Sequence, residues 1–189
     1  MRFHSITLVT GGARSGKSDF AETLTKDLAG NEVIYLATAA ICDEEMAERV
    51  KLHQAKRPAT WKTIERYQGF DTQEFADSIQ GSKALLLDCV GFLLNNLMYE
   101  KIRDREDYTH QDMEEVEALV EQELASLIRV TRSAGINLVA VTNEVGMGIV
   151  PADRMTRYYR DILGRANRLI AKQADSVYLL VAGIPLQIK

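Results

Sequence analysis

The residues best suited to chemistry form one run near the N-terminus, Gly11-Gly12-Ala13-Arg14-Ser15-Gly16-Lys17-Ser18. Their spacing fits the phosphate-binding pattern G-x-x-x-x-G-K-[ST] without deviation. Glycines let the backbone turn so that successive N–H groups point at phosphate oxygens, and a following helix adds its positive N-terminal end. Lys17 brings a full positive charge to the β- and γ-phosphates, and the Ser18 hydroxyl is a ligand for Mg²⁺. The expected ligand is a nucleoside triphosphate, with an accidental glycine-rich turn as the minor alternative.

A carboxylate is expected on the metal side of such a site, at the end of a buried strand. Asp88 follows the apolar run Ala84–Leu87 and is the natural candidate for holding Mg²⁺ through water. A helix N-cap after the strand is a second role open to Asp88, and the two roles are compatible.

His53 is the most informative of the three histidines, because it lies among Lys51, Gln54, Lys56 and Arg57 near the end of a predicted helix. Imidazole can attack phosphorus and form a phosphoramidate, which divides one transfer into two steps. Nearby cations would neutralise the phosphates of the incoming nucleotide. Spacing alone favours a plainer role, in which the helix dipole favours a positive charge at that end.

Short apolar runs alternate with longer helical patterns along the chain. Strands are expected at Ile6–Thr10, Val33–Thr38, Ala84–Asp88, Asn137–Thr142 and Ser176–Val181. Helices are expected at about Lys17–Leu28, Asp43–Lys56, Gly91–Lys101, Gln111–Ser133 and Ala152–Ala174. This alternation is typical of an α/β fold around a mostly parallel sheet, and the phosphate loop makes it a P-loop NTPase-like three-layer fold. Without a linker in its 189 residues, the chain is expected to be a single domain, residues 1–189.

Composition narrows the class of protein. A net charge of −4 argues against a dedicated nucleic-acid surface, and no apolar run approaches the roughly 20 residues that span a bilayer. No signal-peptide pattern precedes Lys17, so a cytoplasmic enzyme with Cys42 and Cys89 reduced is expected. The size argues against a motor, and a switch GTPase would carry an Asn/Thr-Lys-x-Asp element that this chain lacks. A small-molecule kinase or a nucleotidyl transferase remains.

Further segments carry a family resemblance. Beside Thr10–Ser18 they are Tyr35–Thr38, Asp43–Met46, Arg49–His53, Arg57-Pro58, Trp61–Thr63 with Glu65, Leu87–Cys89, Thr142–Pro151, Arg160-Asp161 with Gly164 and Asn167, Ala174-Asp175 and Gly183–Leu186. Over nearly its whole length the chain resembles the bifunctional adenosylcobinamide kinase/adenosylcobinamide-phosphate guanylyltransferases of cobalamin biosynthesis. The run Asn143–Pro151 is especially specific, because no general rule of nucleotide binding demands it.

The resemblance implies two reactions on a corrinoid substrate. In the first, ATP or GTP phosphorylates the hydroxyl of adenosylcobinamide. In the second, GMP from GTP is transferred to that phosphate, giving adenosylcobinamide-GDP and pyrophosphate. The resemblance also implies that His53 carries GMP covalently, which overrides its plainer role, and that the enzyme is a homotrimer.

The same resemblance implies the site residues. Lys17 joins His53 as a catalytic residue, and Ser18 and Asp88 hold Mg²⁺ directly or through water. The nucleotide contacts are expected at Gly11, Gly12, Ala13, Arg14, Ser15, Gly16, Lys17, Ser18, Ala37, Thr38, Ala39, Gln54, Ala55, Lys56, Arg57, Glu65 and Asp88. Family members often carry Glu at the position of Asp88, whose shorter side chain keeps the charge.

Several roles stay open. Glu65 could accept from the guanine N1–H and exocyclic amine, or could be an exposed acid at a strand end. Asn143 and Glu144 have a substrate or a structural role. A solvated face or a subunit contact is favoured over phosphate or corrinoid binding for the arginines at 154, 157, 160, 165 and 168. The rival functions are a simpler kinase for another small alcohol, with His53 structural, and a nucleotide-dependent regulatory module.

Overall fold

A twisted β-sheet forms the centre of the protein, whose computed structural model describes residues 4–40, 58–103, 105 and 107–189. In this part of the chain the sheet has seven strands in the order β3-β2-β4-β5-β1-β6-β7. They are β1 (Ile6–Gly11), β2 (Val33–Ala37), β3 (Lys62–Glu65), β4 (Ala84–Asp88), β5 (Asn137–Val141), β6 (Ser176–Val181) and β7 (Ile184–Gln187). All neighbouring strands are parallel except β6 and β7, which form an antiparallel hairpin.

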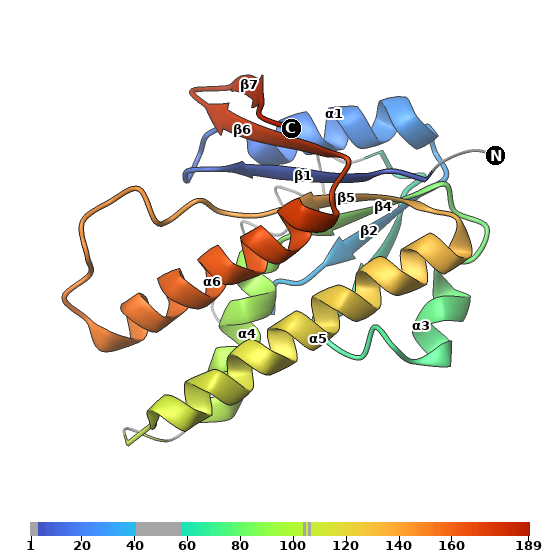
Figure 1. Ribbon diagram of the computed structural model, residues 1–189. Coiled ribbons are helices and arrows are strands. Elements are labelled where there is room, and N and C mark those ends of the chain that lie inside the picture. Colours follow the sequence, from blue (N-terminus) through green and yellow to red (C-terminus); the bar gives the residue numbers. More distant parts are fainter. Residues whose placement is uncertain (1–3, 41–57, 104, 106) are drawn as a thin grey trace.

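Helices cover both faces of the sheet and so give three layers (Figure 1). On one face lies α1 (Lys17–Ala29). On the other lie α3 (Gln73–Ser78), α4 (Val90–Ile102), α5 (His110–Ala134) and α6 (Arg154–Gln173). Strand residues alternate between the two cores: Ile34 and Leu36 point to the α4–α6 side, whereas Val33 and Tyr35 point to the α1 side. Burial on both faces explains why these strands read as continuous apolar runs.

Every strand and helix predicted within the described residues is present, with its ends within two residues of the predicted ones. The predicted helix Asp43–Lys56 lies outside the described residues. Three elements escaped prediction: β3, α3 and β7. Strands β3 and β7 are short sheet edges with mostly exposed side chains, so neither has a clear apolar period, and α3 spans only six residues.

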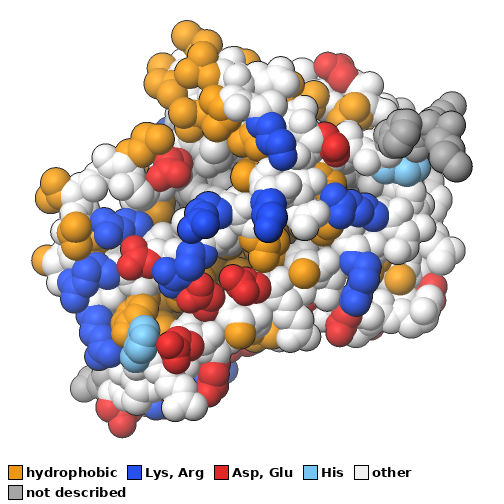
Figure 2. Space-filling view, viewed as in Figure 1, with side chains coloured by type: hydrophobic (Ala, Val, Ile, Leu, Met, Phe, Trp, Pro, Cys, Tyr) orange, Lys and Arg blue, Asp and Glu red, His pale blue; other side chains and the backbone are white. Residues whose placement is uncertain are grey.

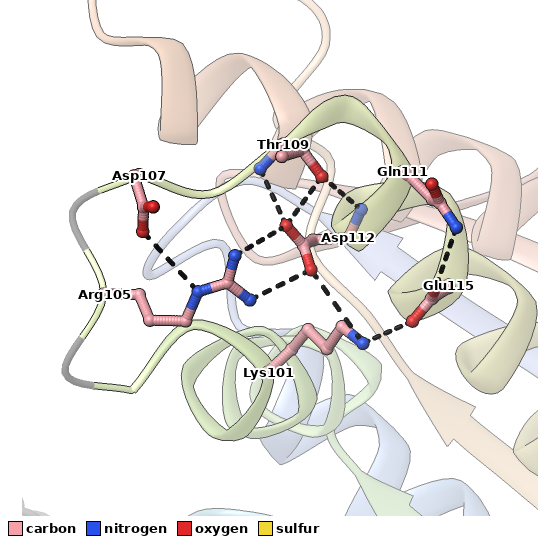
Figure 3. A network of polar contacts seen from close by, with 7 residues as sticks. All are labelled: Lys101, Arg105, Asp107, Thr109, Gln111, Asp112 and Glu115. Atoms are coloured by element: carbon pink, nitrogen blue, oxygen red, sulfur yellow. Dashed lines mark hydrogen bonds and ion pairs between the residues drawn. The ribbon is translucent and has the colours of Figure 1, made fainter.

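A polar network fixes the corner where α4 turns into α5 (Figure 3). Thr109 is the N-cap of α5, and its backbone N–H and hydroxyl donate to the Asp112 carboxylate at 2.8 and 2.7 Å. Both terminal nitrogens of Arg105 donate to the same carboxylate at 3.1 and 3.2 Å. The bonds from Thr109, followed by those from Arg105, hold the pKa of Asp112 well below its usual range.

A pH-dependent contribution to stability follows from this network. We expect Asp112→Asn to lower the melting temperature near neutral pH, because the charged acceptor of these bonds is lost. A depressed folded-state pKa contributes stability above the ordinary value of about 4 and loses it as the pH falls further. The difference between variant and wild type should therefore shrink from about pH 4 downwards in thermal unfolding. Glu121→Gln, an exposed acid on the same helix, is the control, and a difference independent of pH would contradict the prediction.

Candidate active site

The phosphate loop connects the end of β1 to the start of α1. Gly16 is the N-cap of α1 with a left-handed φ of 88°, and a Cβ there would lie 3.3 Å from the Cα of Gly183. The left-handed backbone therefore favours glycine at this position, and the close approach of Gly183 further disfavours a side chain there. Lys17 begins the helix, and its Nζ donates to the carbonyl oxygen of Gly12 at 2.9 Å. The lysine side chain thus folds back over the loop, where phosphate oxygens would compete for its ammonium group.

The turn between β6 and β7 packs against this loop and is hydrogen-bonded to it. The N–H of Gly183 donates to the carbonyl oxygen of Ser15 at 2.9 Å. Ala182 and Gly183 both have left-handed backbones, with φ of 50° and 82°. Sequence reasoning missed this support, because the turn lies far along the chain from the loop.

Asp88 lies at the carboxyl-terminal end of β4, on the same side of the sheet as the phosphate loop, and β5 lies between the two. Val141 of β5 pairs with Val9 of β1 on one side and with Asp88 of β4 on the other. The Asp88 Oδ2 accepts a hydrogen bond from the Tyr35 hydroxyl at 2.5 Å, which orients the carboxylate. The N-cap of α4 is Cys89, so the capping role considered for Asp88 is wrong. Burial lowers the pKa of Lys17, and the electrostatic influence of Cys89 and Asp88 opposes that decrease.

Thr38 joins the end of β2 to the junction of β4 and α4. Its side chain is fully buried, and its hydroxyl accepts from the Cys89 N–H at 2.8 Å and donates to the Cys89 carbonyl at 2.7 Å. Its own N–H donates to the backbone carbonyl oxygen of Asp88, and its carbonyl oxygen accepts from the Asn96 side-chain amide. Its hydroxyl and backbone are thus engaged within the protein, so Thr38 shapes the edge beside Asp88. Cys89 itself is a free, buried thiol, and burial raises its pKa to about 12.

Glu65 is the last residue of β3 and is exposed. In the parallel register it pairs with Ala37, which pairs in turn with Asp88. The predicted nucleotide-binding residues Ala37, Glu65 and Asp88 therefore lie in register at the carboxyl-terminal ends of three neighbouring strands. The position fits either interpretation of Glu65, as a reader of guanine or as an exposed acid at a strand end.

Helix α6 fixes the end of β5, which lies between the phosphate loop and Asp88. The Thr142 hydroxyl donates to the Asn167 side chain at 2.6 Å, and Asn167 donates to the carbonyl of Asn143 at 3.0 Å. The N–H of Glu144 donates to the carbonyl of Gly11 at 3.0 Å. Asn143 and Glu144 are thereby tied to both α6 and the loop.

Tyr159 completes this junction and was missed by sequence reasoning. Its hydroxyl donates to the carbonyl of Gly91 at 3.3 Å and is also hydrogen-bonded to the Asn143 side chain. A Cβ at Gly91 would lie 2.8 Å from that hydroxyl and 3.2 Å from the Asn143 amide nitrogen. Burial raises the pKa of Tyr159 to about 12, so it is a neutral hydrogen-bonding group.

Four of the five arginines singled out on α6 contact other parts of the protein, so a solvated face does not describe these four, whereas Arg168 is exposed. Arg157 donates to the carbonyls of Pro151 and Ala152, and Arg160 donates to that of Ile149. Arg165 pairs with Glu117 of α5, and Arg154 lies over the rings of Tyr108 and Tyr158. For Arg157 and Arg160 the observed role is to position the connection from β5 to α6.

The structure places Gly11–Ser18, Ala37, Thr38, Ala39, Glu65 and Asp88 along the carboxyl-terminal ends of the parallel strands, with Glu65 four strand positions from the phosphate loop. The predicted nucleophile His53, with Gln54, Ala55, Lys56 and Arg57, lies outside the described residues. Within the described part of the chain, no group of three His, Cys, Asp or Glu side chains could hold a metal ion by itself. None of the helices described there has the length and apolar character that crossing a membrane requires.

Several known proteins are similar to this chain. Residues 7–188 match the model of the family described as cobinamide kinase / cobinamide phosphate guanyltransferase. The bifunctional adenosylcobalamin biosynthesis proteins CobU of Escherichia coli and Salmonella typhimurium are 44% and 43% identical over 182 residues, covering 96% of this chain and 98% of each relative. CobP of Pseudomonas aeruginosa is 36% identical over 184 residues, or 96% of each chain. Among solved structures, a KaiC-like protein of Pyrococcus horikoshii matches with a TM-score of 0.47 and 12% identity, over 93% of this chain and 70% of that one.

Proposed function

Because the chain belongs to the cobinamide kinase / cobinamide phosphate guanyltransferase family, we propose that it performs both reactions at one nucleotide site on the carboxyl edge of its sheet. The chain is a bifunctional transferase of adenosylcobalamin biosynthesis with a P-loop NTPase-like α/β fold. The observation that carries the proposed site is the convergence of the phosphate loop, Lys17 and Asp88 at that edge. We propose that residues 1–189 form a single domain, which one sheet with a core on each face supports.

In the kinase reaction, the hydroxyl of adenosylcobinamide gives up its proton and attacks the γ-phosphorus of ATP or GTP, and the bond to the β-phosphate oxygen breaks so that ADP or GDP leaves. Loop N–H groups and the N-terminus of α1 bind the phosphates, while Lys17 neutralises charge that develops in the transition state. The Ser18 hydroxyl and the Asp88 carboxylate are oxygen ligands of the kind Mg²⁺ prefers, and Tyr35 orients the carboxylate. When bound there, Mg²⁺ supplies further charge neutralisation to the phosphates, directly or through water.

In the transferase reaction, a ring nitrogen of His53 attacks the α-phosphorus of GTP, and pyrophosphate leaves with the bonding electron pair. The resulting phosphoramidate holds GMP until a phosphate oxygen of adenosylcobinamide phosphate attacks it, which frees the histidine and gives adenosylcobinamide-GDP. The basic neighbours Lys56 and Arg57, with Gln54 and Ala55, are proposed to contact the nucleotide. We assign guanine selection to Glu65, whose place level with Ala37 and Asp88 supports it.

The proposed assembly is a homotrimer in the cytoplasm, where nucleoside triphosphates are available. Strand β7 is the last of the sheet order, and its outer side pairs with no described strand. The C-terminal hairpin there exposes Val181, Ile184, Leu186 and Ile188 by about half or more. Exposed apolar side chains on a sheet edge mark a surface that a second copy can cover.

Intact-mass spectrometry after incubation with GTP and Mg²⁺ tests the transferase. We expect an adduct of GMP mass that disappears when adenosylcobinamide phosphate is added, and no adduct with ATP. A separate assay of phosphate transfer to adenosylcobinamide tests the kinase. Kinase activity without an adduct would favour a simpler kinase, and the loss of both would favour a regulatory module.

A further inference from the structure

The connection between β5 and α6 exposes an unusual set of apolar side chains. The β5–α6 loop, Val145–Val150, leaves the edge of the sheet and runs outward to the start of α6 (Figure 1). Within it Val145, Met147, Ile149 and Val150 are 37%, 79%, 94% and 65% exposed. Several hydrophobic side chains lie along this part of the surface in the space-filling view, between backbone and Lys or Arg atoms (Figure 2). Exposed apolar groups that are contiguous mark a binding surface more often than scattered ones do.

The loop starts at the proposed reaction site. Glu144 immediately precedes it, and the Glu144 N–H donates to the carbonyl of Gly11, the first residue of the phosphate loop. Asn143 is held by Tyr159 and Asn167 beside the N-terminus of α4, which follows Asp88. The apolar surface is therefore continuous with the place where the acceptor of the transferred phosphorus has to lie.

The backbone of the loop is braced at its far end as well. Arg160 donates to the carbonyl of Ile149 at 3.5 Å, and Arg157 donates to those of Pro151 and Ala152 at 2.9 and 2.6 Å. Gly146 and Gly148 alternate with the apolar residues, and no atom lies within 4 Å of the position a Cβ would take at Gly148. A flat ligand can thus approach the backbone at Gly148, between the large apolar side chains of Met147 and Ile149.

We propose that the β5–α6 loop binds the corrin macrocycle of adenosylcobinamide, an inference that rests on the proposed function. A corrin is a broad ring bearing methyl groups and amide-containing side chains. Its acceptor group must reach the phosphate loop, so the ring must lie just outside the sheet edge. There Met147 and Ile149 cover its methyl groups, and Asn143 is at hand for polar groups near the acceptor. A second copy of the chain is the competing occupant.

The test is the double substitution Met147→Ser/Ile149→Ser. We expect the Kd for adenosylcobinamide, measured by equilibrium titration without nucleotide, and the KM in the kinase assay each to rise by on the order of tenfold. The Kd for GTP, the melting temperature and the yield of the GMP adduct should stay at wild-type values. The matched control is Leu28→Ser/Tyr99→Ser, which removes exposed apolar side chains from α1 and α4 and should leave every one of these quantities unchanged.

Two results would overturn the inference. One is an unchanged Kd for adenosylcobinamide in the double variant. The other is a double variant that forms a smaller oligomer than wild type in light scattering and binds adenosylcobinamide more weakly only to the extent that it dissociates. That result would make the loop an interface between copies of the chain. Failure of the proposed function would give a different result from failure of this inference. Wild-type protein would then bind adenosylcobinamide without phosphorylating it and without forming the GMP adduct, and the Kd of the double variant would still test the binding assignment.

Discussion

Replacing Lys17 with alanine is expected to slow both the kinase and the guanylyltransferase reactions by on the order of a hundredfold or more. The reason is that one ammonium group serves the same bound triphosphate in both reactions. Lys17 starts α1 at the centre of the phosphate loop, and within the described residues its Nζ is bonded to the carbonyl of Gly12. Steady-state rates with adenosylcobinamide and with its phosphate, measured separately, check the prediction.

The fold should survive the loss of Lys17. Burial lowers the pKa of this lysine in the folded protein, which means that folding disfavours its charged form. Removing it should therefore leave the melting temperature unchanged or slightly raised. Lys26→Ala, an exposed lysine in the last turn of the same helix, is the control for a general loss of charge. A Lys17→Ala protein that stays active in either reaction would contradict a shared phosphate site.

Replacing His53 with alanine is expected to separate the two activities. The GMP adduct should vanish and guanylyl transfer should fall by on the order of a thousandfold or more, since the nucleophile is gone. Phosphoryl transfer needs no covalent intermediate, so the kinase rate should change by no more than about threefold, under about 1 kcal/mol in activation free energy. Intact-mass spectrometry with GTP and a kinase assay on the same preparation give both readouts.

The chain offers its own controls for this experiment, because it has only two other histidines. His4 is exposed beside Gly135, and His110 is exposed and stacked on Tyr158. His4→Ala and His110→Ala should retain the full adduct and both activities. Equal loss of both activities in His53→Ala would instead assign this histidine a role in the fold or in nucleotide binding.

The parts of the fold that could be predicted are those that depend on the residue pattern within a single segment of the chain. The strand, loop and helix around Lys17 follow from one motif, and Asp88 follows from an apolar run that ends in a carboxylate. The long stripe of α5, including Met113, Val120 and Leu124, is buried as its spacing predicts.

The parts that were missed depend on contacts between distant residues. Gly183 supports Ser15, Tyr159 holds Gly91 and Asn143, and Asn167 holds Thr142, yet no spacing within one segment encodes any of these pairs. Edge strands were missed for a related reason. With one side unpaired and side chains mostly in solvent, β3 and β7 need no apolar pattern to form.

The position of β5 between the phosphate loop and Asp88 sets a distance within the site. Neighbouring strands lie about 4.8 Å apart, so the backbones at Val9 and Asp88, both paired to Val141, are separated by about 10 Å. The sheet fixes this separation, and no rearrangement of a loop can shorten it. The change from phosphoryl transfer to nucleotidyl transfer must therefore come from movement of the triphosphate relative to the sheet, or from movement of chain segments outside the sheet. The Asp88 carboxylate and the phosphate loop keep their separation in both reactions.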